Sequence, residues 1–494
     1  MIRELIAAAV LAAGAAQAAP RILVPPVALK PEVQALVKVA APRIFLMNVR
    51  VIDGTGAAPL ENRIVVLAGG RIEGVMDAMT TRIGPGPDDK VLDLSGHTVM
   101  PGLVGMHDHM YYIARPNLDA HGHSDAPLVV PQMTFSAPRL YLAAGVTTIR
   151  TTGSVEPYAD LNLKSLIDAG VLPGPHMDVT APYLEGAGSP FIQMHRLTGP
   201  DDARRTVAYW ADQGATSFKA YMNISRAGLG AAIEEAHKRG LKVTGHLCSV
   251  TYPEAALLGI DNLEHGFYVN TQLDPGKQPD ICPATSGGPT ILAMTPESPA
   301  GAALIRQLVA RKVAITSTLP VFEQRTPWRT PLNARAMAVL SPPSREAYLY
   351  ARNLASQAPR ERYADATKML ANTMAMERAF VRAGGLLMAG PDPTGNGGVI
   401  PGFGDHRAIE LLVDAGFTPM EAIRIGTLNG ATYLGLADQI GSVTSGKIAD
   451  LLVVKGNPAT TITDIENVVI VFKDGIGYDP DKLLDSVRGR YGQY

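Results

Sequence analysis

The sequence predicts an α/β protein, a (β/α)8 TIM barrel with a small β-sandwich domain built from both chain ends. Two observations support this prediction. The middle of the chain alternates apolar, strand-like runs with helical patterns, as a closed parallel barrel requires. Strand-rich segments lie at both ends of this middle part. We therefore expect the small β-domain at 42–100 and 431–476, and the barrel at 101–430 with a helical insertion at 319–384.

The composition indicates a folded protein with no electrostatic preference for nucleic acid. Of the 494 residues, 46% are hydrophobic and 18% are charged, which is the opposite of the composition of disordered chains. The 44 Lys and Arg residues nearly balance the 46 Asp and Glu residues, and no basic block stands out. Nucleic acid is therefore not an expected partner. A small-molecule substrate is expected, and a homo-oligomer is compatible with the sequence.

The first residues have the pattern of a secretory signal peptide. Arg3 precedes an apolar run over 5–16, which ends in a small-residue A-Q-A site. We expect a signal peptide at 1–19, and export to the periplasm or the medium after cleavage. A short buried helix or an uncleaved anchor is the alternative. A helix that spans a bilayer needs about 20 apolar residues, and no later apolar run comes near this length. No membrane contact is therefore expected for the mature chain.

The β-domain is predicted from short β-like runs separated by Gly-rich turns. Four runs follow the first segment and three return near the far end, which suggests one sheet-rich domain made from both. These runs are 44–52, 63–67, 71–75 and 90–93, then 441–443, 450–455 and 468–473.

The barrel strands are predicted where short apolar runs precede helical patterns such as 227–239, which has a polar face. The segment 319–384 after the seventh strand is largely helical in pattern, and a connection of this length more often forms a lid or a specificity element. The eight strands are expected at 98–106, 146–151, 176–181, 217–221, 242–246, 262–265, 313–318 and 386–389.

Ionisable residues stand where several of these strands end, and active sites of such barrels form there. Residues two apart on a strand point to the same side, so His107 and His109 can hold one cation. Imidazole together with carboxylate suits zinc or a similar ion. Four histidines facing one barrel mouth without a metal would be costly to desolvate. The candidate ligands are His107, His109, Lys219, His246, His265 and Asp392.

Lys219 and a second histidine pair each allow two interpretations. An ammonium group beside two cations would be repelled, so an inward-facing Lys219 suggests reaction of its neutral amine with carbon dioxide. The resulting carbamate is an anionic ligand that can bridge two metals. A lysine that closes a core salt bridge is the alternative. His121 and His123 form another HxH pair, but they lie in a polar stretch, where a loop or surface pair is expected instead of a metal site.

Four motifs, taken in order, resemble those of the metal-dependent amidohydrolase superfamily. The similarity extends to its imidazolonepropionase-related branch, which includes prolidase-like and ochratoxin-hydrolysing enzymes, and it covers roughly residues 42–476. The chain departs from the usual pattern in having the aspartate in GPDPT instead of GTD, and in the long insertion after the seventh strand. The motifs are MPGLVGMHDH, GATSFKAYM, NLEHG and GSVTSGKIADLLVVKGNP.

The resemblance implies a site with two divalent metal ions, expected to be Zn²⁺. One metal would be held by His107, His109 and Asp392, the other by His246 and His265, and a carbamate on Lys219 would bridge them. Asp392 would also act as the catalytic general base and then as the general acid.

Two residues that follow ligand positions have open roles. Tyr221, two residues beyond Lys219, resembles a substrate-carboxylate contact of the branch, and a tyrosine that packs at the barrel rim is the alternative. Cys248 follows His246 by two residues. Export permits a Cys248–Cys282 disulfide, and a free thiol near the site is the alternative.

Together these features predict a hydrolase that cleaves amide C–N bonds of peptide-like or N-acyl amino acid substrates, with a metal-bound hydroxide as the nucleophile. Hydrolysis of a cyclic amide or a lactone by the same site is the alternative, because loops determine the substrate on this scaffold. A non-catalytic binding protein disagrees with the complete ligand set. A deaminase with a single metal would not need Lys219.

Overall fold

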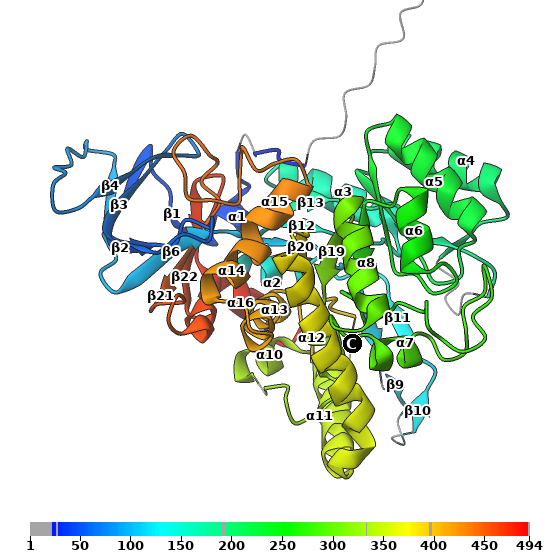
Figure 1. Ribbon diagram of the computed structural model, residues 1–494. Coiled ribbons are helices and arrows are strands. Elements are labelled where there is room, and N and C mark those ends of the chain that lie inside the picture. The colour runs from blue at the N-terminus through cyan, green and yellow to red at the C-terminus, as the bar shows by residue number, and fades with distance from the viewer. Residues whose placement is uncertain are drawn as a thin grey trace, which may run out of the picture.

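The computed structural model describes residues 22–25, 28–115, 117–119, 121, 123–188, 194–331, 333–394 and 398–492. The predicted signal peptide at 1–19 lies outside these residues. The architecture is α/β, with parallel strands and helices in one part and a sheet from both chain ends in another (Figure 1). None of the helices in the described ranges is long and apolar enough to cross a bilayer.

Eight parallel strands overlap the eight predicted runs, in the same order. Two short parallel strands, β14 (Leu184–Glu185) and β15 (His195–Arg196), come between the third and the fourth of them, and β14 pairs with the fourth. β7, β12 and β13 pair with one another, and β16 to β20 pair in sequence. Hydrogen bonds join the two groups at both junctions, from Ala181 N to Ser217 O (3.1 Å) and from Met106 N to Ala389 O (2.9 Å). The strands are β7 (Leu103–Gly105), β12 (Val146–Arg150), β13 (His176–Asp178), β16 (Ser217–Ala220), β17 (Lys242–Gly245), β18 (Asn262–Glu264), β19 (Ala314–Ser317) and β20 (Leu387–Ala389).

The first predicted strand, 98–106, is divided at Gly102. Its first half is β6 (His97–Pro101), which belongs to the sheet made from the chain ends, and only its second half is β7. A Cβ atom on Gly102 would lie 2.3 Å from Thr147 Oγ1, so glycine is needed where the chain passes this close to β12. The chain thus leaves one sheet and enters the other just before the first two histidines of interest.

A helix follows each of the eight parallel strands, as the alternating pattern predicted. Side chains determine where some of them begin. Ser225 caps α5, and Thr251 with Glu254 forms a reciprocal capping box at α6. The helices are α2 (Ala137–Ala143), α3 (Pro157–Asp168), α4 (Pro200–Asp212), α5 (Arg226–Lys238), α6 (Tyr252–Leu258), α8 (Pro299–Ala310), α12 (Ala364–Arg382) and α13 (Phe403–Asp414).

Both chain ends contribute to one nine-stranded sheet, in which the blue and red strands of Figure 1 lie side by side. The ends meet where β6 pairs antiparallel with β21, and buried side chains of both ends share one apolar cluster. The pairing reaches slightly beyond the predicted 42–100 and 431–476. The strands are β1 (Val37–Val39), β2 (Arg43–Val51), β3 (Leu60–Ala68), β4 (Arg71–Asp77), β5 (Lys90–Asp93), β6, β21 (Leu451–Lys455), β22 (Val468–Lys473) and β23 (Ile476–Tyr478).

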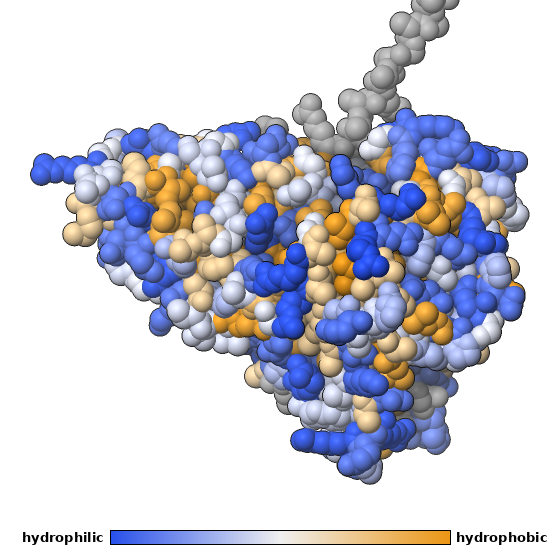
Figure 2. All heavy atoms as spheres, in the orientation of Figure 1, coloured by the Kyte–Doolittle hydropathy of each residue, from blue (hydrophilic) through white to orange (hydrophobic). Residues whose placement is uncertain are grey.

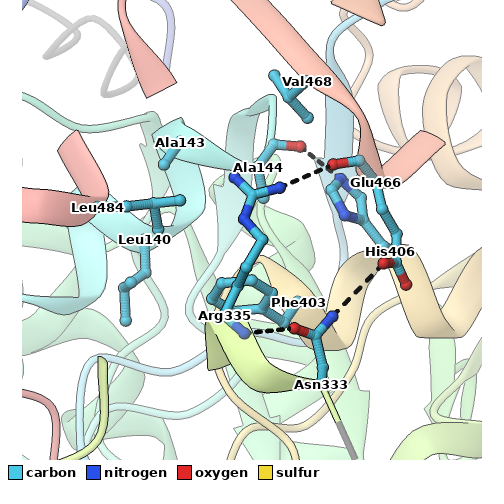
Figure 3. Close-up of a pocket in the computed structure, with 10 residues that line it drawn as sticks. All are labelled: Leu140, Ala143, Ala144, Asn333, Arg335, Phe403, His406, Glu466, Val468 and Leu484. Carbon is cyan, nitrogen blue, oxygen red and sulfur yellow. Dashed lines mark hydrogen bonds between the residues drawn. The ribbon is translucent and has the colours of Figure 1, made fainter. Parts of the chain in front are cut away.

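The segment after β19 is helical, as its pattern predicted. It forms α9 (Leu319–Glu323), α10 (Ala334–Val339), α11 (Pro342–Ser356) and η1 (Arg360–Tyr363) before α12, and α11 projects from the body beside α12 in Figure 1. Figure 3 shows where this segment meets the chain before β22: Arg335 Nη1 donates to Glu466 O at 3.2 Å, and Asn333 Nδ2 donates to Glu466 Oε2 at 3.4 Å. These bonds tie the base of the insertion to the segment that leads into the end sheet.

On the face shown in Figure 2, hydrophobic residues form small separate groups among hydrophilic ones.

Shorter elements complete the described fold. The shorter elements are α1 (Pro31–Gln34), β8 (Tyr112–Ala114), β9 (Asn117–Leu118), β10 (Ser124–Asp125), β11 (Leu128–Val130), β14 (Leu184–Glu185), β15 (His195–Arg196), α7 (Gly288–Ala293), α14 (Pro419–Arg424), η2 (Ile425–Asn429), α15 (Gly430–Tyr433), η3 (Ile462–Glu466) and α16 (Pro480–Ser486).

Candidate active site

The six side chains that the sequence predicts as metal ligands gather at the carboxyl ends of the parallel strands. Their positions follow from the strands: the first two come after β7, the lysine lies within β16, and the others follow β17, β18 and β20. Since parallel strands end on the same side of a sheet, side chains far apart in sequence meet there. The six are His107, His109, Lys219, His246, His265 and Asp392.

The donor atoms of these side chains approach one another closely. Lys219 Nζ lies 3.2 Å from His107 Nε2. Asp392 Oδ1 lies 3.1 Å from His109 Nε2 and 3.5 Å from His107 Nε2. His265 Nδ1 lies 3.8 Å from Asp392 Oδ2, and the rings of His246 and His265 are 4.4 Å apart between centroids. All six predicted residues therefore belong to one cluster.

Buried groups behind the cluster hold the imidazoles in place. His107 Nδ1 lies 2.7 Å from Glu264 Oε2, and Arg150 Nη2 donates to Glu264 Oε1 at 2.7 Å. His109 Nδ1 faces the carbonyl of Thr151 at 2.9 Å. Both side chains of the Arg150–Glu264 pair are almost fully buried. Such partners fix the orientation of a ligating imidazole and leave its other nitrogen free to bind.

The sequence analysis did not identify Glu264 and Arg150. Alternation places Asn262 and Glu264 on the same side of β18, so His265 should point the opposite way. Instead His265 has φ +68°, a conformation that few non-glycine residues adopt. This turn at the end of the strand lets both Glu264 and His265 face the cluster. Asp392 also has a positive φ, +55°, and backbone strain of this kind concentrates at functional sites.

Burial and neighbouring charges shift the protonation of these groups. Burial and the charge of Lys219 lower the pKa of His107 well below its usual range, and the same two causes lower the pKa of His246 to about 3. Burial lowers the pKa of Lys219 to about 8. Burial acts to raise the pKa of Asp392, but the neighbouring His107 and His109 lower it below its ordinary value. Neutral imidazoles and an ionised carboxylate are the forms that bind metals.

The donor set fits a divalent metal. One donor atom each from His107, His265 and Asp392 lie within 4.8 Å of one another. The Nε2 atom of His265 is buried and has no hydrogen-bond partner among the described residues. Metal–ligand distances of about 2.0–2.2 Å in a tetrahedral zinc site separate neighbouring donors by about 3.3 Å, close to the spacing of His107 and His109 from Asp392. A cation bound beside His265 would satisfy its unpaired nitrogen.

A cavity of about 180 Å³ opens above the cluster. Five of the six candidate ligands and Tyr221 line it, and His107 lies beneath. The Tyr221 ring is 4.8 Å from the His246 ring and 5.0 Å from the Tyr183 ring, between centroids. Burial raises the pKa of Tyr221, so its hydroxyl stays protonated and can donate a hydrogen bond to a ligand in the cavity.

The other histidine pair lies elsewhere. His121 and His123 are exposed, and His123 Nδ1 lies 3.3 Å from Asp119 in the same loop. As the sequence suggested, these two histidines do not line the cavity.

Two contacts could not be read from local sequence. Cys248 and Cys282 form a disulfide with a Cα–Cα distance of 4.8 Å, so the structure contains the bonded form of this pair and not the free thiol. His176, at the start of β13, lies 3.2 Å from Asp474 Oδ1 and 3.6 Å from Asp450 Oδ2. This buried group connects the parallel strands to the sheet of the chain ends.

Comparisons with known proteins agree with the motifs. The model of the amidohydrolase family matches residues 362–476. An adenine deaminase of Ruegeria sp. is 43% identical over 47 residues, 10% of this chain and 8% of the deaminase. The alignment with this curated relative therefore spans only a small part of that protein.

Solved structures are similar over nearly the whole chain. A protein from Bifidobacterium longum described as a prolidase is 25% identical, with a TM-score of 0.63, and the match covers 91% of this chain and 100% of that one. The ochratoxinase of A. niger is 17% identical, with a TM-score of 0.62, and covers 92% of this chain and 100% of its own. The family match, the four ordered motifs and these two structures agree: the chain is similar to the amidohydrolase family over residues 362–476 and has the fold of these prolidase-like structures.

Proposed function

We propose that the protein is a metal-dependent hydrolase that cleaves amide C–N bonds of peptide-like or N-acyl amino acid substrates. The observation that carries this proposal is the convergence of four imidazoles, a lysine and an aspartate at the floor of one cavity. Lys219 Nζ lies 3.2 Å from His107 Nε2, and Asp392 Oδ1 lies 3.1 Å and 3.5 Å from the Nε2 atoms of His109 and His107. Similarity to a protein described as a prolidase supports the same class of reaction.

The site would hold two divalent metals, with Zn²⁺ as the expected ion. The metal ions supply activation of water near neutral pH and polarisation of the substrate carbonyl. His107, His109 and Asp392 would hold the deeper ion, and His246 with His265 the ion nearer the cavity.

Lys219 would carry a carbamate that bridges the two ions. Its Nζ atom lies 3.2 Å from His107 Nε2, and the described residues give it no carboxylate within ion-pair distance. A neutral amine at this position reacts with carbon dioxide by forming an N–C bond and releasing one proton. The carbamate would supply the negative charge that the cluster of imidazoles lacks.

Asp392 would carry out the proton transfers of the reaction. Its carboxylate lines the cavity and is held by His109 at 3.1 Å. As a general base it would accept the proton of the attacking water, and as a general acid it would deliver that proton to the departing nitrogen. An amine leaves poorly unless it is protonated, so amide cleavage depends on this transfer. Tyr221 would donate a hydrogen bond to a substrate carboxylate next to the scissile amide.

We also propose a fold and a cellular compartment for the enzyme. The two junction hydrogen bonds between the strand groups support a closed (β/α)8 barrel, and the shared apolar cluster of the end sheet supports a β-sandwich packed from both ends. Export to the periplasm or medium is supported by the Cys248–Cys282 disulfide, since disulfides persist in oxidising compartments.

The test measures metal content and hydrolysis together. The protein is reconstituted with Zn²⁺ and assayed against dipeptides and N-acyl amino acids beside its Lys219→Ala and Asp392→Asn variants. We expect two zinc ions per chain in the unaltered protein, with metal and activity lost together in Lys219→Ala. Asp392→Asn should reduce kcat by at least about a hundredfold. Full activity of Lys219→Ala, or full activity with one metal per chain, would overturn the binuclear model.

Matched substrates separate the proposed class from its alternative. N-acyl amino acids are compared with their methyl esters, and a cyclic amide and a lactone are tested in parallel. Preference for the free carboxylate, reduced about ten- to a hundredfold in Tyr221→Phe, would support the proposal. Faster turnover of the cyclic amide or lactone, with no carboxylate preference, would favour the alternative.

A further inference from the structure

A second cavity, of about 480 Å³, adjoins the site. We call it the outer chamber. It shares four lining residues with the cavity above the metal ligands, namely Arg115, Val321, Arg325 and Thr394. The two cavities are therefore adjacent, and a ligand whose reacting group lies at the metal ligands would reach the outer chamber past these four side chains. This chamber is more than twice as large as the inner cavity.

The insertion supplies most of the outer chamber's wall. Val321 lies in α9, Arg325 follows it, and Tyr348 with Arg352 comes from α11. The remaining parts of the wall follow β7 and β20. In the order of the eight parallel strands, β20 stands four strands from β16 in either direction. The outer chamber thus lies across the mouth from Tyr221, which follows β16.

The lining of the outer chamber carries positive charge. Three arginines face it, Arg115, Arg325 and Arg352, and its described lining contains neither Asp nor Glu. None of the three forms an ion pair with a carboxylate of the described residues. Among the described residues that line the inner cavity, Asp392 is the single carboxylate, and it already contacts the histidines. A guanidinium offers a planar set of donors that matches a carboxylate, so this lining suits an anion.

Two of the arginines are held in position without a counter-charge. Arg352 donates to Tyr348 Oη at 3.0 Å and to the carbonyl of Thr330 at 2.7 Å. The Arg325 guanidinium lies 5.4 Å from the centre of the Tyr268 ring and 5.8 Å from that of Phe322. Positioned cations lose less conformational entropy when they bind a ligand than mobile ones do.

We propose that the outer chamber binds the acyl part of the substrate, and that this part is extended and bears a carboxylate. The inference rests on the proposed amide hydrolysis, because that reaction places the scissile bond at the metal ligands. The amine-side carboxylate would then face Tyr221, and the acyl chain would run to the opposite side, between Arg325 and Arg352. The substrate class is a dianionic N-acyl amino acid or a peptide with an acidic residue before the scissile bond.

The test compares acyl chains that differ only at their far end. N-glutaryl and N-pentanoyl derivatives of one amino acid have similar lengths, but only the first ends in a carboxylate. We expect kcat/KM of the reconstituted protein to favour the glutaryl substrate by about ten- to a hundredfold, the range for a charge-assisted hydrogen bond. Arg325→Gln should remove most of this preference, because it should lower kcat/KM for the glutaryl substrate much more than for the pentanoyl substrate. Arg360→Gln, an exposed position of the same insertion outside the chamber, is the matched control.

A binding measurement distinguishes a failure of this inference from a failure of the proposed function. Calorimetry measures binding of N-glutaryl amino acid to the unaltered protein and to Arg325→Gln. If neither substrate is hydrolysed but binding is lost in Arg325→Gln, the proposed function is wrong and the outer chamber is an anion site. If both substrates are hydrolysed equally, and Arg325→Gln behaves like Arg360→Gln, the proposed function stands and the inference is overturned. Arg352→Gln repeats the comparison if Arg325→Gln fails to fold.

Discussion

Replacing Glu264 by glutamine tests whether a buried carboxylate behind His107 determines the metal affinity of the site. Glu264 Oε2 lies 2.7 Å from His107 Nδ1, and Glu264 Oε1 accepts from Arg150 Nη2 at 2.7 Å. Glutamine keeps the size of the side chain, but it removes the charge and retains only one oxygen. One of the two contacts must therefore be lost, and the other is weakened.

The size of the effect follows from these contacts. Loss of the partner behind a ligating histidine lowers metal affinity about 10–100-fold, or about 1.4–2.7 kcal/mol. Arg150 also loses its carboxylate, and removing one partner of a buried ion pair costs about 3–5 kcal/mol of unfolding free energy. Arg150 keeps its hydrogen bonds to Asn262 and Thr316, so the lower end of that range is expected.

Two measurements check this prediction. Competition with a chelator of known affinity gives the zinc affinity, and urea unfolding gives the stability. Glu234→Gln, which removes the same charge from an exposed position of α5, is the control and should change neither quantity. A Glu264→Gln protein with a native circular dichroism spectrum and unchanged zinc affinity would refute the reasoning.

Three further changes have predictable outcomes. Burial raises the pKa of Glu377 from 4.5 to about 8, so the folded state keeps a proton that the unfolded chain releases. Unfolding free energy should therefore fall by several kcal/mol between about pH 4.5 and 8, at about 1.36 kcal/mol per pKa unit. In Glu377→Gln the unfolding free energy should change less between these two pH values. Urea unfolding measures it at both, and an equal change in the variant and the unaltered protein would contradict the prediction. The Cys248–Cys282 bond closes a loop with a sequence separation of 34 residues, for which chain entropy predicts a stabilisation of the folded state of about 4 kcal/mol. Reduction should therefore lower the melting temperature, and the melting temperature of the double Cys→Ser variant should not change with reductant. A melting temperature unaffected by reductant would argue against the bond. His176→Gln removes the imidazole beside Asp474 and Asp450, while Lys473 still pairs with Asp474. We expect a loss of about 1–3 kcal/mol in denaturant unfolding, the cost of leaving a buried polar group without its partner. An unchanged unfolding free energy would show that the His176 contact does not stabilise the fold.

Several features of the protein could be predicted from residues that are close together in the sequence. A spacing of two residues was enough to pair His107 with His109, although both lie after β7 and not within it. Short motifs at strand ends identified Lys219, His246 and Asp392. Each of these inferences uses only neighbours in sequence, because side-chain direction repeats with a fixed period in strands and helices. The same local information predicted the eight parallel strands and the helical insertion.

The strand boundaries show the limit of that information. A run of apolar residues from 98 to 106 predicts one strand, yet the chain divides at Gly102 between two sheets. Hydropathy does not distinguish one buried strand from two short ones in different sheets. The close approach of Thr147, which only a glycine permits, determines the division, and it depends on how β12 packs.

The sequence alone therefore predicted the six side chains that gather in one cluster, the order of the strands and the similarity to amidohydrolases, since these depend on spacing within short segments. Only the tertiary structure decided which groups stand behind the ligands. The Arg150–Glu264 pair joins residues 114 positions apart along the chain. The contact of His176 with Asp450 joins residues more than two hundred positions apart. Such contacts leave no periodic signal in the sequence. They form because a buried charge must find a partner within a few ångströms, and the packing of the whole chain determines which partner is near.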